Sequence, residues 1–244
     1  MKKCLVLISS EDDAFKLDGT IRSFFFNCAD PDQCEIKILY KASAENNKKQ
    51  YKHLAEENAV LGNVLFIESR DFKKDLLWIV APYEYCLFLT DDMIFVRGFS
   101  ILDIISNLDL NSDMLAFSLG LGKNTIFNSQ TKDKQPLPEF KKINNNIYKF
   151  NWTSSQNDFS LPLQVQGFFY RTDDIFPVMA NENFTDVKTF ASSLSAHARE
   201  FAGQKPLLFN YEFSAAYRNL TEYKTNEDNL SKITRINVAG YQGY

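Results

Sequence analysis

Histidine and paired cysteines are scarce in this chain. Its 244 residues include only two histidines, His53 and His197, which excludes a metal site built from several histidines and leaves little room for Ser-His-Asp catalysis. The four cysteines form no Cys-x-x-Cys pair, and Cys4 and Cys86 fall in predicted strands. We therefore expect buried free thiols in a protein of a reducing compartment.

The chain also lacks a basic excess and a long apolar run. Its formal net charge of -4 argues against a surface that coats nucleic acid, so no nucleic-acid partner is expected. No stretch approaches the ~20 apolar residues of a membrane span. The short apolar run at 4–8 stops at acidic residues 11–13 without a cleavage-site pattern. These absences predict a cytoplasmic protein with no membrane span.

Apolar and aromatic residues, by contrast, are plentiful. Hydrophobic residues make up 45% of the chain, and 22 residues are Phe, enough for a substantial, ring-rich core. In the first half, short apolar runs that predict strands alternate with longer runs of helical spacing. Strands are predicted at 4–8, 35–40, 64–67, 85–89 and 114–118, and helices at 14–27, 44–61, 72–80 and 101–108. This alternation indicates an α/β protein with a mainly parallel sheet.

The second half breaks this pattern. A long polar stretch, 119–158, is expected to be a loop that is functional or partly disordered. A strand-like run follows at 163–170, and helices are predicted at 172–179 and 185–201. From Pro206 the chain mixes aromatic and polar residues and closes with an apolar run at 233–238. Because neither a repeat nor a linker is visible, we interpret residues 1–244 as a single domain.

Two adjacent acids, Asp91 and Asp92, follow the predicted strand at 85–89. This position puts both carboxylates at the carboxyl edge of the sheet, where open α/β folds build ligand sites. Neighbouring carboxylates repel each other unless positive charge lies between them, and a divalent cation carrying phosphate oxygens is the usual solution. The pair is equally compatible with a plain polar turn, in which Asp is common.

The glycines in Gly120-Leu121-Gly122-Lys123 do not form a known phosphate-binding loop. A Walker loop needs Gly at position 117 and Ser or Thr at 124, and these positions are Phe117 and Asn124. The dinucleotide pattern fails as well, because position 125 is Thr125 rather than Gly. The glycines are therefore expected to end the fifth predicted strand.

Five segments follow one another along the chain: LISS at 7–10, GTIRS at 19–23, ILYKAS at 38–43, FKKDL at 72–76 and LFLTDD at 87–92. Taken in this order, they resemble the opening of nucleotide-sugar glycosyltransferases of the GT-A fold, in particular small bacterial and viral ones. The resemblance covers roughly residues 1–120 and is patchy beyond. It implies a Rossmann-like, mixed, mainly parallel sheet flanked by helices. It divides the domain into a nucleotide-sugar-binding half (about 1–118) and an acceptor half (about 119–244).

The resemblance also implies an activity and a metal. Such enzymes transfer a sugar from a nucleotide sugar, here expected to be a UDP-sugar, to a hydroxyl group of a glycan, a lipid-linked acceptor or a small molecule. Asp92 would be the direct ligand of Mn²⁺ or Mg²⁺, and Asp91 would face the ribose or a metal-bound water. Met93 stands where related sequences often carry a third acid.

The strand ends are expected to hold the nucleotide. By the resemblance, Ser9, Ser10 and Glu11 after the first strand, and Tyr40 and Lys41 after the second, flank the base and ribose. Two further cations, Arg22 and Lys74, are candidates for the base edge or the phosphates, although both also suit a solvated surface.

A general base is harder to assign. Related sequences often place an acid two residues before a Gly that corresponds to Gly167, and here that position is Val165, followed by Gln166. Asp158 is the best remaining candidate for a catalytic base, followed by Asp173 and Asp174, which also suit the first turn of a helix. Without a base, the protein would be a retaining transferase or a non-catalytic nucleotide-sugar-binding or scaffold domain of a larger protein. The oligomeric state is not indicated by the sequence.

Overall fold

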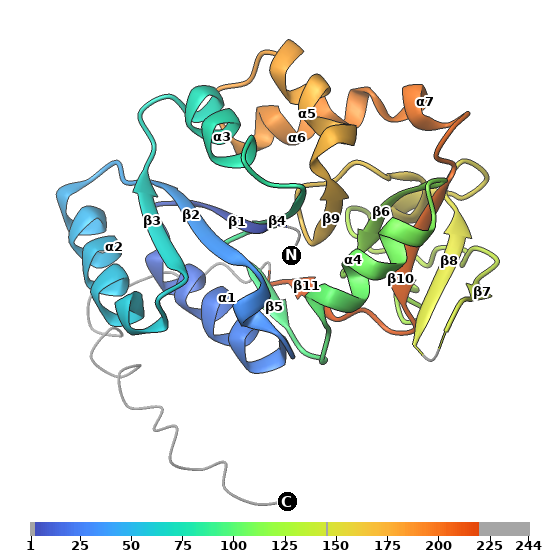
Figure 1. Ribbon diagram of the computed structural model, residues 1–244, viewed down its shortest axis with the longest axis horizontal. Helices are drawn as coiled ribbons and strands as arrows, with labels where there is room; N and C mark the ends of the chain where they lie inside the picture. Colours follow the sequence, from blue (N-terminus) through green and yellow to red (C-terminus); the bar gives the residue numbers. More distant parts are fainter. Residues whose placement is uncertain (1–2, 145, 220–244) are drawn as a thin grey trace, which may run out of the picture.

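A nine-stranded mixed sheet forms the centre of the molecule (Figure 1). The computed structural model describes residues 3–144 and 146–219, and the predicted apolar run at 233–238 lies outside them. The strand order is β3-β2-β1-β4-β9-β6-β10-β8-β7. The strands are β1 (Cys4–Glu11), β2 (Glu35–Lys41), β3 (Val64–Glu68), β4 (Tyr85–Thr90), β6 (Met114–Ser118), β7 (Lys141–Lys142), β8 (Ile147–Asn151), β9 (Phe168–Arg171) and β10 (Leu207–Tyr211).

The direction of the strands changes in the middle of the sheet. Strands β3, β2, β1 and β4 are parallel, as the βαβ pattern predicts. Strand β9 then runs antiparallel between β4 and β6, β10 is parallel to β6, and β8 is antiparallel to β10. Because β9 is antiparallel to β4, its first residue, Phe168, pairs with Phe88 near the end of β4. The α/β fold class with a mixed, mainly parallel sheet is confirmed.

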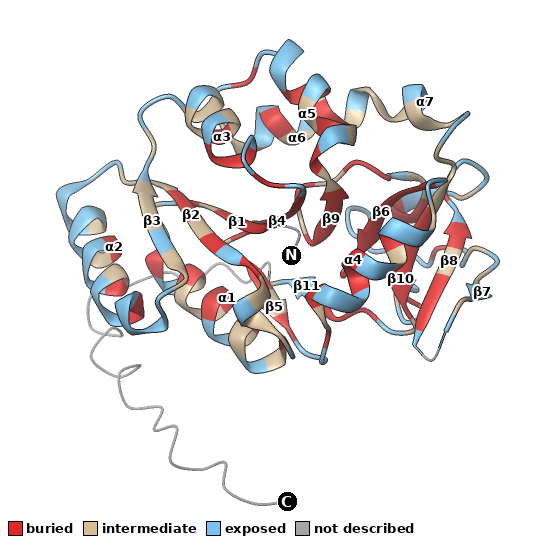
Figure 2. Ribbon diagram, in the orientation of Figure 1, coloured by how far each residue is buried: buried red, intermediate tan, exposed pale blue. Residues whose placement is uncertain are grey.

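Helices cover both faces of the sheet. The side chains of each strand alternate between the two faces, so neighbouring residues pack against different helices. Alternate residues of β1 belong to different cores: Cys4, Val6 and Ile8 pack with α1, α2 and α4, whereas Leu5 and Leu7 pack with α3, α5 and α6. Figure 2 shows the buried residues gathered on the strands and on the inward helix faces. The helices are α1 (Ala14–Asn27), α2 (Glu45–Asn58), α3 (Phe72–Val80), α4 (Ile101–Leu110), α5 (Thr172–Asn181), α6 (Val187–Ala196) and α7 (Ala198–Phe201), with 3-10 turns η1 (Pro31–Gln33), η2 (Ala59–Leu61) and η3 (Asn157–Ser160).

The predicted elements of the first half are confirmed to within a few residues, and the second half needs four corrections. The strand-like run at 163–170 forms a strand only from Phe168, because Gly167 adopts a left-handed backbone with φ of 76° just before it. The helix predicted at 185–201 is two helices that meet at His197. The loop predicted at 119–158 contains β7 and β8, and the tail after Pro206 contains β10 and β11 (Ala216–Arg218).

Strand β11 forms a second, two-stranded sheet with β5 (Met93–Phe95), the short strand directly after the acidic pair. All four cysteines are buried and free, as the sequence predicts. Among the described residues, no helix combines the length and apolar character needed to cross a membrane.

Gly122 marks a close approach between the turn after β6 and the segment that leads to β11. A Cβ atom at this position would lie 2.5 Å from the backbone nitrogen of Ser214 and 2.8 Å from the carbonyl carbon of Phe213. At Gly120, in the same turn, the nearest atoms would lie 3.9 and 4.0 Å away. The second glycine of the Gly-x-Gly sequence is therefore required by backbone packing.

We expect Gly122→Ala to lower the free energy of unfolding by about 1–3 kcal/mol, because backbone atoms have to move to accept the methyl group. Gly120→Ala is the matched control and should change stability by no more than about 0.5 kcal/mol. Urea unfolding of both variants tests this, and equal stability of the two would contradict the packing argument.

Candidate functional site

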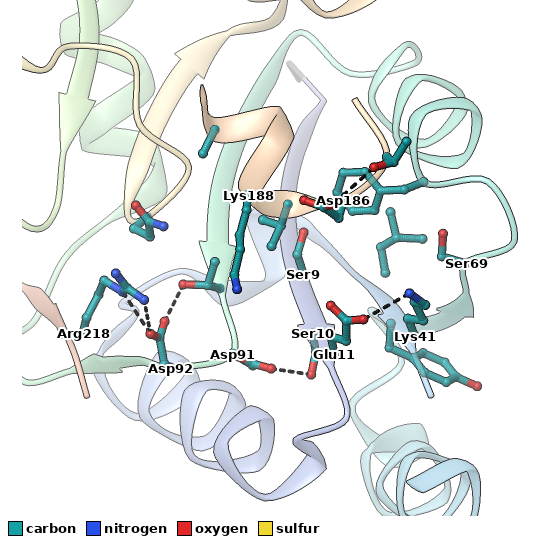
Figure 3. Close-up of a pocket in the computed structure, with 18 of the residues that line it drawn as sticks. Ser9, Ser10, Glu11, Lys41, Ser69, Asp91, Asp92, Asp186, Lys188 and Arg218 are labelled. Carbon is teal, nitrogen blue, oxygen red and sulfur yellow. Dashed lines mark hydrogen bonds and ion pairs between the residues drawn. The ribbon is translucent and has the colours of Figure 1, made fainter. Parts of the chain in front are cut away.

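A cleft of about 700 Å³ opens at the carboxyl ends of the parallel strands (Figure 3). Its walls come from the strand ends, the turn before β9, the start of α6 and β11. The lining residues that carry polar groups are Ser9, Ser10, Glu11, Tyr40, Lys41, Ser69, Arg70, Thr90, Asp91, Asp92, Gln166, Thr185, Asp186, Lys188 and Arg218. The volume lies within the range of small-molecule binding sites, about 300–1,000 Å³.

Asp91 lies at the floor of the cleft, between β4 and β1. Its backbone N–H donates to the carbonyl of Ser9 at 3.1 Å and its carbonyl accepts from the Thr20 hydroxyl at 2.6 Å, so the turn is fixed on both sides. Its carboxylate accepts a hydrogen bond of 2.7 Å from Ser10. Burial raises the pKa of Asp91 to about 6; the Ser10 hydroxyl partly offsets this rise, and the carboxylates of Asp13 and Asp92 add to it.

Asp92 points away from Asp91, toward β11. One carboxylate oxygen accepts from the Thr90 hydroxyl at 2.5 Å. The other accepts from Nε and Nη2 of Arg218 at 2.9 and 2.7 Å. Figure 3 shows the two acids directed to different partners, Asp91 to Ser10 and Asp92 to Arg218.

An aromatic wall closes the side of the cleft formed by β2. The ring of Tyr40 stacks on Tyr51 of α2, with ring centroids 4.3 Å apart. Tyr51 is fully buried, and its hydroxyl lies 2.6 Å from the Ser10 hydroxyl. The stack thus connects the wall to the acidic floor through Tyr51, Ser10 and Asp91. Beside it, Lys41 pairs with Glu11 at 3.1 Å across neighbouring strand ends.

Most of the nucleotide-site residues predicted from the sequence meet in this cleft. Residues Ser9–Glu11, Tyr40, Lys41 and both acids of the pair all line it. Arg22 and Lys74 do not. Arg22 pairs with Asp18 and Glu57 on an exposed surface, and Lys74 pairs with Asp71 at 2.9 Å.

The candidate bases also lie away from the cleft lining. Asp158 is buried, and its carboxylate accepts hydrogen bonds from the N–H and hydroxyl of Ser129, both at 2.8 Å, and from Gln135 at 3.2 Å. These contacts tie the loop at 125–135 to η3. Asp174 pairs with Arg171 and Lys205, and Asp173 is exposed in the first turn of α5. A role for any of them as a base stays a prediction.

Several lining residues were not predicted as site residues. Ser69 and Arg70 follow β3, and the rule that placed the acidic pair at the carboxyl edge of the sheet could have found them. Gln166, considered in the sequence only as a position without an acid, reaches the cleft because it lies in the turn at Gly167, two residues before β9. Lys188 of α6 and Arg218 of β11 carry no signal in the sequence, since tertiary packing alone brings them to the strand ends.

Whether this site suits a metal ion depends on the donor atoms that its side chains offer. The described residues contain no group of three or more His, Cys, Asp and Glu side chains that could hold a metal. Asp91 and Asp92 nevertheless offer hard oxygen donors, and the pKa of Asp91 is raised by burial first and by the carboxylates of Asp13 and Asp92 second. The two carboxylates therefore fit a divalent cation that takes its remaining ligands from phosphate oxygens and water.

Known structures share this fold. Staphylococcus aureus TarS (1-349) in complex with UDP superimposes with a TM-score of 0.57 at 12% identity, covering 89% of this chain and 60% of that one. GalNAc-T7 with UDP, GalNAc and Mn²⁺ gives a TM-score of 0.58 at 10% identity, covering 93% of this chain and 46% of that one. The chain has the GT-A glycosyltransferase fold.

A sequence relative supports the same assignment. The bifunctional glycosyltransferase pgtA of Dictyostelium discoideum is 26% identical over 189 residues, which cover 70% of this chain. The chain spans 24% of that relative's length, so it matches only a part of it. No protein-family model matches the chain. In this GT-A fold the acidic pair after β4 lies in the cleft with the ends of β1 and β2.

The raised pKa of Asp91 predicts a pH-dependent cost in stability. Between its ordinary value of 3.8 and about 6, the folded protein holds a proton that the unfolded chain has released. The free energy of unfolding therefore falls as pH rises through this window, by about 2–3 kcal/mol in total. Asp91→Asn should be more stable than the wild type by up to about this amount at pH 7, and the difference should vanish near pH 4.

Urea unfolding between pH 4 and 7.5 measures this difference. Asp113→Asn removes one charge from an exposed position and is the matched control. An Asp91→Asn variant no more stable than the wild type at pH 7 would refute the expected burial cost.

Proposed function

We propose that this protein is a metal-dependent glycosyltransferase that moves a sugar from a UDP-sugar to a hydroxyl acceptor such as a glycan, a lipid-linked sugar or a small molecule. The observation that carries this proposal is the acidic pair after β4, which faces a cleft at the strand carboxyl ends of a GT-A fold. The UDP named with TarS and with GalNAc-T7 supports the choice of nucleotide. The free buried cysteines suit the cytoplasm as the site of reaction.

In this proposal the nucleoside lies over the ends of β1 and β2. The Tyr40 ring, held by its stack on Tyr51, offers an apolar surface to the base or ribose. The Glu11–Lys41 pair at the rim provides both an acceptor and a donor for ribose or base atoms. Ser69 and Arg70, at the end of β3, extend this polar rim.

The diphosphate then lies near the acidic pair. Asp92, with Asp91, would hold Mn²⁺ or Mg²⁺, and the bound cation would supply Lewis-acid stabilisation of the departing nucleoside diphosphate. The protein's own contribution is to hold the two carboxylates rigidly. Thr20 and Ser10 fix Asp91, and Thr90 fixes one oxygen of Asp92. Lys188, on the opposite wall, adds positive charge from α6.

A second candidate function is a nucleotide-sugar-binding module without catalysis. It is favoured by the carboxylates of the cleft, each of which already has a partner among the described residues. Glu11 pairs with Lys41, Asp91 with Ser10 and Asp92 with Arg218, and Asp186 caps α6. Hydrolysis of UDP-sugars in the absence of acceptor separates the two functions: slow metal-dependent release of UDP favours the transferase, and its absence despite tight binding favours the module.

Metal dependence is the first test of the proposed site. We expect UDP to bind about a hundredfold more tightly with Mn²⁺ than with EDTA, because two carboxylates alone repel a diphosphate. Asp92→Asn should remove most of this difference. Calorimetry with and without metal gives the answer, and equal UDP affinity in both conditions would count against a metal site.

The aromatic wall gives a second test. Tyr40→Ala should weaken UDP and UDP-sugar binding alike by about tenfold, because the exposed ring face is lost. Tyr40→Phe is the matched control that keeps the ring and its stack on Tyr51, and it should bind nearly as the wild type does. If Tyr40→Ala binds UDP normally and changes only the sugar preference, the nucleotide does not lie on this wall.

A further inference from the structure

Arg218 occupies the space directly in front of Asp92. Its Nε and Nη2 atoms lie 2.9 and 2.7 Å from one Asp92 oxygen, and the Thr90 hydroxyl engages the other oxygen. Asp92 is only 9% exposed, so few directions of approach to its carboxylate are open. The guanidinium therefore covers the cleft side of the acid predicted to be the direct metal ligand.

The position of Arg218 is set by backbone contacts rather than by chance orientation of a long side chain. Strand β11 pairs with β5 so that Arg218 lies opposite Met93, the residue after Asp92. The next N–H, of Asn219, donates to the carbonyl of Asp92 at 2.6 Å. Arg97 donates to the carbonyl of Ser214 at 2.9 Å and holds the approach to β11. These backbone contacts thus place the Arg218 guanidinium beside the acidic pair.

The Arg218 side chain is only partly buried. The Arg218 side chain is 46% exposed, whereas that of Asp92 is 12% exposed. The guanidinium lines the cleft, and on the opposite wall Lys188 extends from α6 toward the acidic pair (Figure 3). No ion pair is found for Lys188 among residues 3–144 and 146–219. Arg218 and Lys188 thus line the same cleft from opposite walls.

A guanidinium and a divalent cation cannot both occupy the cleft side of Asp92. The pair distances of 2.7 and 2.9 Å fill the space that a metal coordinated by the same oxygen would need. The two cations would also repel each other across this short distance in a largely buried site. Binding of either one therefore opposes binding of the other.

We propose that Arg218 and a divalent cation bind Asp92 in mutually exclusive states, and that Arg218, once displaced, joins Lys188 in contacting the diphosphate. The diphosphate part rests on the proposed function, whereas the competition for Asp92 does not. In the state without metal, Arg218 neutralises the acid. In the loaded state, the same charge serves the anionic leaving group. Metal binding and nucleotide binding are then coupled, because the nucleotide gives the displaced guanidinium a new partner.

The competition is tested with Mn²⁺ alone, on the full chain, by electron paramagnetic resonance of the free ion. Arg218→Gln should bind Mn²⁺ about tenfold more tightly than the wild type, because no resident cation has to be displaced. Arg218→Lys keeps the positive charge but loses the two-pronged guanidinium contact, so its affinity for Mn²⁺ should lie between those of the wild type and Arg218→Gln. Arg199→Gln, on the exposed surface of α7, is the control for loss of one positive charge and should leave Mn²⁺ binding unchanged.

Calorimetry with UDP at saturating Mn²⁺ tests the second part. Arg218→Gln and Lys188→Gln should each weaken UDP by about tenfold, and only Arg218→Gln should alter binding of Mn²⁺ alone. Unchanged or weaker Mn²⁺ binding by Arg218→Gln would overturn the competition. If that variant does not fold, as judged by circular dichroism, the Arg218→Lys result decides in the same way. Failure of the wild type to bind UDP at all would refute the proposed function and the diphosphate contact, but not a measured competition for Mn²⁺.

Discussion

Two adjacent carboxylates at the end of a fully buried strand are the constraint around which this molecule is organised. All six residues of β4 are buried, and the chain emerges from the core directly into Asp91 and Asp92. Like charges in such a position need compensation. The surroundings supply it separately: the Ser10 hydroxyl donates to the Asp91 carboxylate, and Thr90 and Arg218 donate to that of Asp92.

The insertion of β9 explains why the cleft opens at this point. Strand β9 enters antiparallel beside β4, so the segment before it arrives where β4 and β1 end. Gly167, with φ of 76°, makes this entry possible, and its N–H donates to the carbonyl of Phe88 at 2.9 Å. The second half of the chain contributes Gln166, Lys188 and Arg218 to the walls of a cleft whose floor is built by the first half. Residues from both halves of the chain thus line a single cleft.

The compensation of the acidic pair is incomplete, and this incompleteness is informative. A pKa of about 6 for Asp91 means that burial and neighbouring charge disfavour its ionised form. Such a cost is typical of positions kept for binding or chemistry rather than for stability. Arg218 neutralises the charge of Asp92, and the Arg218 side chain remains about half exposed. In the proposed scheme, Asp91 receives the positive charge of a bound cation, and Asp92 exchanges Arg218 for that cation.

The sequence by itself determined the α/β alternation, the position of β4 and the place of the acidic pair at the sheet edge, and its resemblance to a family added Ser9, Tyr40 and Lys41. These features are local: strand period, helix spacing and the rule that parallel strands end at one edge are all readable along the chain. Only the tertiary structure decided the antiparallel entry of β9, the strands β5, β7, β8, β10 and β11, and the separation of Arg22, Lys74 and Asp158 from the cleft. It also brought Arg218 onto Asp92, 126 positions earlier in the chain. Contacts of this kind depend on packing between distant segments, and no local pattern of residues encodes them.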